Sequence, residues 1–122
     1  MDVETVDFVS VLTQDIPRAK RFYGETLGLP IETEGENDLE FTLGQVTLDV
    51  FNPASVGREF APSPAGIAIR VPDVAAARAE LEAKGVQFDG AIVDTGVCHF
   101  AFFEDPDGNK LMLHRRHAPR ER

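Results

Sequence analysis

One pattern occurs twice in the chain, and it restricts the possible folds more than any other feature of the sequence. Each copy joins an apolar strand-like run to an aspartate and then to a helix-like run, in SVLTQDIPRA and in AIRVPDVAAA. Asp15 and Asp73 stand at matching positions, where a carboxylate at a helix N-cap can accept hydrogen bonds from free backbone N–H groups. A unit with one helix cannot cover both faces of its own sheet. The repeat therefore indicates a duplicated supersecondary unit.

The residues around each copy predict the order βαβββ. β-branched and apolar runs separated by Gly, Asn and Pro indicate short strands, and apolar residues at helical spacing between Asp15 and Gly28 and between Asp73 and Gly85 indicate the helices. We expect a single α+β domain over 1–122, in which two βαβββ modules form a curved mixed sheet around a central cavity with the helices outside. The expected parts are module one at about 6–51, a proline-rich linker at about 52–64, module two at about 65–114, and a solvated polar tail at 115–122. Predicted strands cover 6–13, 30–33, 39–43, 46–51, 66–71, 86–88, 97–103 and 110–114.

Charge and composition exclude several classes of partner. The chain has a formal net charge of −9, whereas nucleic acids and anionic membrane surfaces attract basic proteins. No run approaches the roughly 18 apolar residues of a membrane-spanning helix. The N-terminal residues carry early acids and do not resemble a secretory leader, and the single Cys98 cannot form an intrachain disulfide. We expect a cytoplasmic protein with no nucleic-acid or membrane partner.

Two motifs, one in each half, carry a family resemblance. FYGETLGLP ends the first Asp-capped helix, and FFEDPDGNKLMLH forms the last predicted hairpin. Together with the duplication, they resemble the vicinal oxygen chelate superfamily, which includes glyoxalase I, extradiol dioxygenases, fosfomycin-resistance enzymes and bleomycin-resistance proteins. The resemblance runs from residue 6 to about 114. It implies the two-module fold and a homodimer, and it leaves the function open among lyases, isomerases, oxygenases and binding proteins.

The resemblance also implies where catalytic relatives hold a metal ion. There a histidine opens the first strand of each module, and a Glu or Gln near the end of each module completes the set. In this chain those positions fall at Phe8, Gly66, Met112 and either Leu48 or Asp49. Phenylalanine, glycine and methionine do not suit a hard or borderline divalent cation, so only Asp49 could remain as a ligand. We therefore expect no metal and no other cofactor in the inherited site.

The alternation of side chains along strands then predicts which residues line the cavity. Ser10 would share the face of Phe8, Arg70 that of Gly66, and His114 that of Met112. The intervening residues of these strands are uniformly apolar, as a face packed against helices should be. The residues that we predict to contact a ligand are Phe8, Ser10, Asp49, Arg70, His99, Met112 and His114.

The DPDGN turn brings His99 into this prediction. Antiparallel pairing about Pro106 and Asp107 would set His99 opposite His114, with both imidazoles facing the cavity. The two histidines could hold one group of a ligand, or they could lie half-exposed at the rim of the sheet. A third possibility is a new metal site that they complete with Asp49 or Glu40.

Other candidate residues have both a structural and a functional interpretation. Arg70 lies in an apolar strand, so it needs either an acidic or oxygen-rich ligand or a salt bridge to Glu40 or Asp49. The aromatic and thioether side chains could form a stacking floor for a planar ligand or belong to the core; they are Phe8, Phe103 and Met112. Cys98 points away from its neighbour His99 and is expected to be a small buried hydrophobe. Ser10 has no evident base beside it.

Three functions are compatible with these observations. The first is a metal-free protein that binds a small organic molecule, aromatic or antibiotic-like, between the modules, as a homodimer. The second is a metal-dependent lyase, isomerase or dioxygenase of the same superfamily that uses His99, His114 and an acid as a relocated site. The third is an interaction module without turnover. The first is favoured because the inherited ligand positions have been replaced, and whether the protein is an enzyme is left open.

Overall fold

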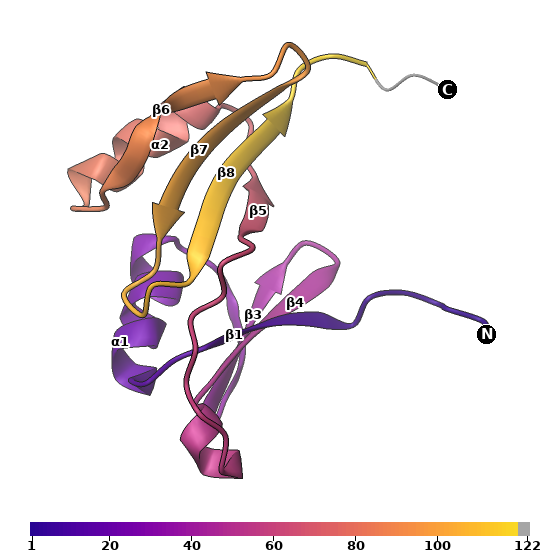
Figure 1. Ribbon diagram of the computed structural model, residues 1–122, viewed down its shortest axis with the longest axis vertical. Coiled ribbons are helices and arrows are strands. Elements are labelled where there is room, and N and C mark those ends of the chain that lie inside the picture. The colour runs from indigo at the N-terminus through magenta and orange to yellow at the C-terminus, as the bar shows by residue number, and fades with distance from the viewer. Residues whose placement is uncertain (120–122) are drawn as a thin grey trace. The chain divides into compact units, whose positions relative to one another are not determined.

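The computed structural model describes residues 1–119 and divides the chain into two compact units, Met1–Ser63 and the part that begins at Pro64. Each unit contains one four-stranded mixed sheet, with its helix inserted after the first strand (Figure 1). The α+β class and the two βαβββ modules predicted from the sequence are therefore confirmed. The central cavity would need both modules, and it stays a prediction.

Module one has the strand order β1-β4-β3-β2, in which β1 runs parallel to β4 and the other pairs are antiparallel. A parallel pair needs a crossover connection, and the helix between β1 and β2 begins it. A short 3₁₀ helix, η2, follows the module inside the predicted linker. The elements are β1 (Phe8–Leu12), α1 (Ile16–Lys20), η1 (Arg21–Thr26), β2 (Ile31–Glu34), β3 (Asp38–Leu43), β4 (Val46–Phe51) and η2 (Pro53–Val56).

The helix of module one begins at the predicted cap. The Asp15 carboxylate accepts a hydrogen bond from the backbone N–H of Arg18, and Pro17 occupies the first turn, where no partner for its nitrogen is needed. The helix continues through η1 as a π-helical turn, and the chain then leaves it at Gly28, which has a positive φ of 72°.

The helix side of this sheet forms the core of module one. Tyr23 packs edge-on to Phe22 and against Phe41, with ring centroids 5.2 and 5.8 Å apart. Leu39 and Phe41 in β3 and Leu48 and Val50 in β4 are fully buried, and the spacing of two residues is that of a sheet with one covered face. The buried apolar residues are Val11, Ala19, Tyr23, Leu39, Phe41, Leu48 and Val50.

Module two repeats this topology with the strand order β5-β8-β7-β6 and a parallel β5–β8 pair. Asp73 caps its helix by accepting a hydrogen bond from the backbone N–H of Ala76 at 3.0 Å. α2 lies against β6, β7 and β8 (Figure 1). The buried apolar residues are Val74, Leu81, Cys98, Ala101, Phe103, Leu111 and Leu113. The elements are β5 (Ile67–Arg70), α2 (Val74–Ala83), β6 (Phe88–Asp94), β7 (Cys98–Glu104) and β8 (Lys110–Arg116).

Two boundaries in module two differ from the prediction. β6 covers Phe88–Asp94, whereas the sequence predicted a strand over 86–88. Gly90 and the acids around it are unfavourable for a strand, so the pattern did not predict one there. The register of β6 against β7 also shifts within this segment. β8 continues to Arg116, and the backbone N–H of His117 donates to the carbonyl of Val97, so the predicted tail begins with ordered residues. The rest of that tail, residues 120–122, lies outside the described residues. Neither α1 nor α2, the two α-helices of the described chain, is long and apolar enough to cross a bilayer.

Candidate functional site

The turn between β7 and β8 sets which side chains of module two share a face. The carboxylate of Asp105 accepts hydrogen bonds from the backbone N–H groups of Asp107 and Asn109 and from Asn109 Nδ2, at 2.8 to 2.9 Å. Asp105 and Asn109 are both buried. The turn therefore closes over five residues, Asp105–Asn109, and it pairs Glu104 with Lys110.

This register corrects the pairing expected from the sequence. His99 lies opposite Arg115, and His114 lies opposite Phe100, so the predicted pairing of His99 with His114 is wrong. The prediction centred the hairpin between two turn residues, whereas the turn is centred on one residue, and a shift of one residue moves side chains to the other face. His99 points to the α2 side of the sheet and His114 to the opposite side. Because the two imidazoles lie on opposite sides of the sheet, His99 and His114 cannot form a shared site.

The side of this sheet that is turned away from α2 carries six residues in two rows. The first row is Ala68, Met112 and Phe102, and the second is Arg70, His114 and Phe100. The residues that alternate with them, Ala101, Phe103, Leu111 and Leu113, are buried on the side of α2. We call this set the helix-free face of module two, and four of its members, Arg70, His114, Met112 and Ala68, were placed on one face by sequence reasoning.

The aromatic residues of the helix-free face form a continuous surface. Phe100 and Phe102 stack with an interplanar angle of 5° at 5.9 Å, and the His114 ring lies 4.7 Å from Phe100. All three side chains are half-buried. Phe103, which we had weighed as part of this floor, is 1% exposed and packs on Phe88 in the core.

Arg70 places a positive charge beside these rings. It is exposed at the end of β5, next to His114 on β8. Within the described part of module two, no carboxylate forms an ion pair with it, as the pairs present all involve other residues. The alternative pairing with Glu40 or Asp49 of module one stays a prediction. A planar ligand with an acidic group would find both a ring surface and a cation on this face.

The residues at the inherited metal positions do not fit a cation. Gly66 has a φ of +87°, and a Cβ built on it would lie 2.9 Å from the terminal methyl group of Met112. The thioether side chain therefore occupies the space that a ligating side chain at position 66 would need. Neither residue offers a nitrogen or oxygen donor, and Phe8 in module one is 56% exposed and equally without one.

In module one, the face turned away from the helix carries polar and acidic residues beside the exposed ring of Phe8. Ser10, Asp49 and Glu40 form one row across β1, β4 and β3, and the Ser10 hydroxyl donates to Asp49 at 3.3 Å. Glu32 accepts a hydrogen bond from Thr42 at 2.8 Å.

Asp49 is the most perturbed group of this row. Its burial raises the pKa of the carboxyl above the ordinary value, and the negative charges of Asp38 and Glu40 raise it further, while the hydrogen bond from Ser10 opposes them. Desolvation and like charges both disfavour the ionised form. Asp49 is therefore better suited to hydrogen-bond a polar ligand than to bind a metal alone.

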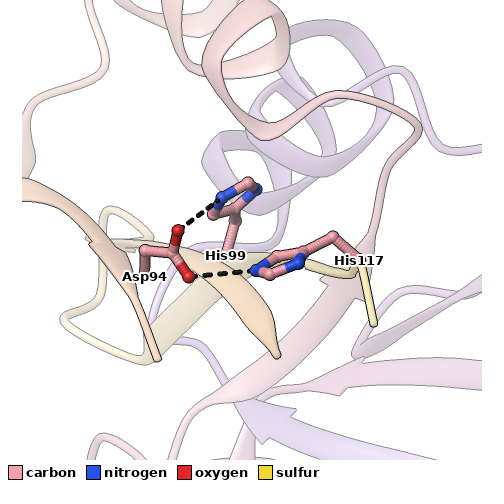
Figure 2. Close-up of side chains that lie close together, drawn as sticks. All are labelled: Asp94, His99 and His117. Carbon is pink, nitrogen blue, oxygen red and sulfur yellow. Dashed lines mark hydrogen bonds and ion pairs between the residues drawn. The ribbon is translucent and has the colours of Figure 1, made fainter. Parts of the chain in front are cut away.

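A second group of polar residues lies on the other side of module two. Asp94, at the end of β6, accepts hydrogen bonds from Nε2 of His99 at 3.2 Å and from Nε2 of His117 at 3.0 Å. Figure 2 shows the carboxylate beside the two imidazoles, one oxygen turned toward each ring. The hydrogen bond to His117, the N–H of Gly96 and the hydrogen bond to His99 lower the pKa of Asp94 to about 2. We call Asp94, His99 and His117 the Asp–His–His cluster.

Sequence reasoning named His99 but missed Asp94 and His117. His117 fell in the predicted tail, and Asp94 lay in a stretch to which no strand was assigned. The available signal was the count of histidines. The chain has only three, and all of them follow residue 98. With a hairpin turn of five residues, His99 pairs with Arg115, and His117 lies two residues beyond that partner.

Comparison with models of known protein families gives a match that agrees with the fold. The family model described as glyoxalase/bleomycin resistance protein/dioxygenase superfamily matches residues 5–113. No curated protein matches the chain by sequence.

Solved structures of related fold include binding proteins and an enzyme. TnmS3, an antibiotic-binding protein from Streptomyces sp. CB03234, is 29% identical with a TM-score of 0.78, over 95% of this chain and 98% of its own. A glyoxalase/bleomycin resistance protein from the same organism is also 29% identical, with a TM-score of 0.73, over 91% of this chain and 100% of its own. Lactoylglutathione lyase from Agrobacterium tumefaciens is 17% identical with a TM-score of 0.79, over 93% and 94%, and shows the fold alone.

Proposed function

Because the chain belongs to the glyoxalase/bleomycin resistance protein/dioxygenase superfamily, we propose that it binds a planar aromatic small molecule without the help of a metal. The observation that carries the proposal is the helix-free face of module two. It combines two stacked phenylalanines and a histidine ring with Arg70, which forms no ion pair with a carboxylate among the described residues of its module. Ligand pockets are typically built in this way, from apolar surface with a few polar groups.

Each part of this face has a defined role in binding. Phe100 and Phe102 provide the surface on which a ring system stacks, and such contacts are worth about 0.5–1.5 kcal/mol beyond the area they bury. Arg70 pairs with a carboxylate or another oxygen-rich group of the ligand, and its planar guanidinium can make two parallel hydrogen bonds. His114 and Met112 complete the surface. In module one, Ser10, Asp49 and Phe8 are the residues that we propose to contact the same ligand.

The similarity to an antibiotic-binding protein agrees with this proposal. TnmS3 covers nearly the whole chain at 29% identity. The misfit of Gly66 and Met112 to a cation also supports binding without the inherited metal. We propose that the ligand is antibiotic-like, aromatic and acidic, and that sequestration is the function.

Fluorescence of the ligand tests the proposal directly. The protein contains no tryptophan and a single tyrosine, Tyr23, which is fully buried, so its own emission is weak. Anthracene-2-carboxylate serves as the probe, and anthracene-2-carboxamide is its neutral match. We expect saturable binding of the carboxylate, and about tenfold weaker binding by Arg70→Gln, since a hydrogen bond to a charged group contributes about 1.5–3 kcal/mol before solvent screening.

The control variant separates stacking from charge. Phe102→Leu removes a ring and should weaken the binding of both probes, whereas Arg70→Gln should leave the affinity for the carboxamide unchanged. Failure of both probes to saturate at high concentration would refute the proposal and leave the metal-dependent enzyme and the interaction module as the alternatives. Equal loss of both probes in Arg70→Gln would overturn the assignment of the arginine.

We also propose that the protein acts as a homodimer in the cytoplasm. The resemblance to the superfamily supports the dimer, and a free, buried Cys98 agrees with a reducing compartment. Sedimentation equilibrium measures the mass, and a monomer at all concentrations would refute the dimer. Cell fractionation followed by detection of the chain checks the compartment.

A further inference from the structure

We propose that Asp94, His99 and His117 form a site for a divalent transition-metal ion such as Zn²⁺, separate from the proposed ligand-binding face. One ligand atom from each of these residues can be chosen so that all of them lie within 4.8 Å of one another. Two imidazoles and one carboxylate are a donor set that transition metals accept, whereas Mg²⁺ and Ca²⁺ prefer oxygen ligands alone.

The distance from each imidazole nitrogen to the nearer oxygen of Asp94 is close to the separation of two ligand atoms on one metal ion. With metal–ligand bonds of about 2.1 Å, neighbouring ligand atoms lie about 3.0 Å apart in an octahedron and about 3.4 Å apart in a tetrahedron. The carboxylate oxygens of Asp94 lie 3.2 Å from His99 Nε2 and 3.0 Å from His117 Nε2. The Nε2 atoms of both rings are turned toward the same carboxylate (Figure 2). A cation would thus replace two hydrogen bonds with small movements of the three side chains.

The backbone around the cluster holds its members in place. The Asp94 carboxylate also accepts from the N–H of Gly96 at 2.8 Å, and the N–H of His117 donates to the carbonyl of Val97 at 2.8 Å. Thr95 and Cys98 close the connection between β6 and β7, because the N–H of Thr95 donates to the carbonyl of Cys98 at 3.0 Å. The ligand atoms are therefore preorganised by a short hairpin and by the end of β8.

The surroundings leave room for further ligands of the ion. His99 and His117 line an open groove of about 650 Å³, together with Arg115, Arg116, Ile92 and the first turn of α2. Their side chains are 40% and 35% exposed, and that of Asp94 is 55% exposed, so the site is accessible to an ion from solution. An ion held by three protein groups keeps coordination positions for water or a small anion.

This site is independent of the proposed function because it lies on the other side of the sheet. His99 neighbours Phe100 in β7, and adjacent residues of a strand point to opposite faces. Phe100 and His114 belong to the helix-free face, whereas His99 lies on the α2 side. Loss of one site should therefore leave the other intact.

Calorimetry with Zn²⁺ on protein without a histidine tag tests the proposal. We expect one equivalent to bind, with no competition from excess Mg²⁺. His117→Gln and Asp94→Asn should each weaken Zn²⁺ at least about tenfold, since even partners of metal ligands contribute 10–100-fold to affinity. His114→Gln is the matched control, and it should leave the affinity for Zn²⁺ unchanged. His117→Gln should in turn bind anthracene-2-carboxylate like the wild type.

The three histidines also allow a direct spectroscopic assignment. Imidazole resonances of His99 and His117 should shift on addition of Zn²⁺, while those of His114 stay in place. Thermal unfolding in the presence of a chelator verifies that each variant is folded. Weak, non-saturating binding, the same affinity in His117→Gln as in the wild type, or a shift of the His114 resonances would each overturn the assignment.

Discussion

Replacement of Asp105 by alanine should remove the strongest local constraint in module two. Asp105 is 5% exposed, and its carboxylate accepts hydrogen bonds from the backbone N–H groups of Asp107 and Asn109 and from the amide of Asn109. Asn109 is fully buried, so its backbone N–H and its Nδ2 would each lose this acceptor in a place that water reaches poorly. The third donor, the N–H of Asp107, is half-buried and can be rehydrated.

The magnitude follows from these contacts. A buried donor without a partner costs about 1–3 kcal/mol, and a rehydrated one costs less. Two buried donors and one accessible donor therefore predict a loss of about 3–5 kcal/mol in the free energy of unfolding. That is a large fraction of the 5–15 kcal/mol that typically holds a domain together.

Urea denaturation followed by far-ultraviolet circular dichroism measures this loss. Asp105→Asn should lower the free energy of unfolding by less than Asp105→Ala does. The amide oxygen of the new side chain can still accept from the backbone N–H groups, whereas its NH₂ group would face the NH₂ group of Asn109, so that contact would be lost. The double exchange Asp105→Asn with Asn109→Asp should recover most of the stability, since the amide and the carboxylate then only change places. A loss below about 1 kcal/mol in Asp105→Ala would refute the argument that this carboxylate fixes the turn.

Three further predictions concern single positions. Gly66→Ala should lower the free energy of unfolding by about 1–2 kcal/mol because of the positive φ, and by about 1 kcal/mol more because Met112 must move. Gly90→Ala has a φ of +70° but open space around it, so the same urea titration should show only the cost of the positive φ. Asp94 should be about 90% ionised at pH 3, because its pKa of about 2 lies below the usual value of about 3.9, and carboxyl ¹³C NMR in the presence of a chelator measures this. The ionised carboxylate should stabilise the folded state above about pH 4, and this stabilisation should be lost as the pH falls through 2. A titration midpoint near 3.9 would contradict the hydrogen-bond assignment. Asp73→Ala should cost about 1 kcal/mol of unfolding free energy and Asp73→Asn much less, because only the alanine removes the N-cap acceptor.

The features that the sequence predicted well are local or repeated. Asp15 and Asp73 each cap a helix because the acceptor lies within three residues of its donor, so spacing alone identifies it. The duplication then implied the module order. Alternation of apolar residues correctly assigned Leu111 and Leu113 to the core, because one face of the sheet is covered.

The features that it missed depend on turn length and on contacts between distant residues. One extra residue in the loop around Asp105 changed the face of His99, and composition does not reveal whether a turn is centred on a residue or on a bond. His117 and Asp94 are 23 residues apart, and their contact requires the register of β7 and the extension of β8 to be known first. Strand β6 is mostly exposed, so its buried and exposed residues do not alternate and its sequence does not predict a strand.

The close fit of Gly66 to Met112 bears on how this lineage could evolve. A histidine introduced at position 66 would meet the methyl group of Met112 and would also need a backbone conformation that L-residues rarely adopt. A chelating pair at positions 66 and 112 would therefore require two exchanges and a local change of the main chain. Exchanges at the other positions of the helix-free face avoid both obstacles, so this face can vary there more readily than it can gain a ligating side chain at position 66.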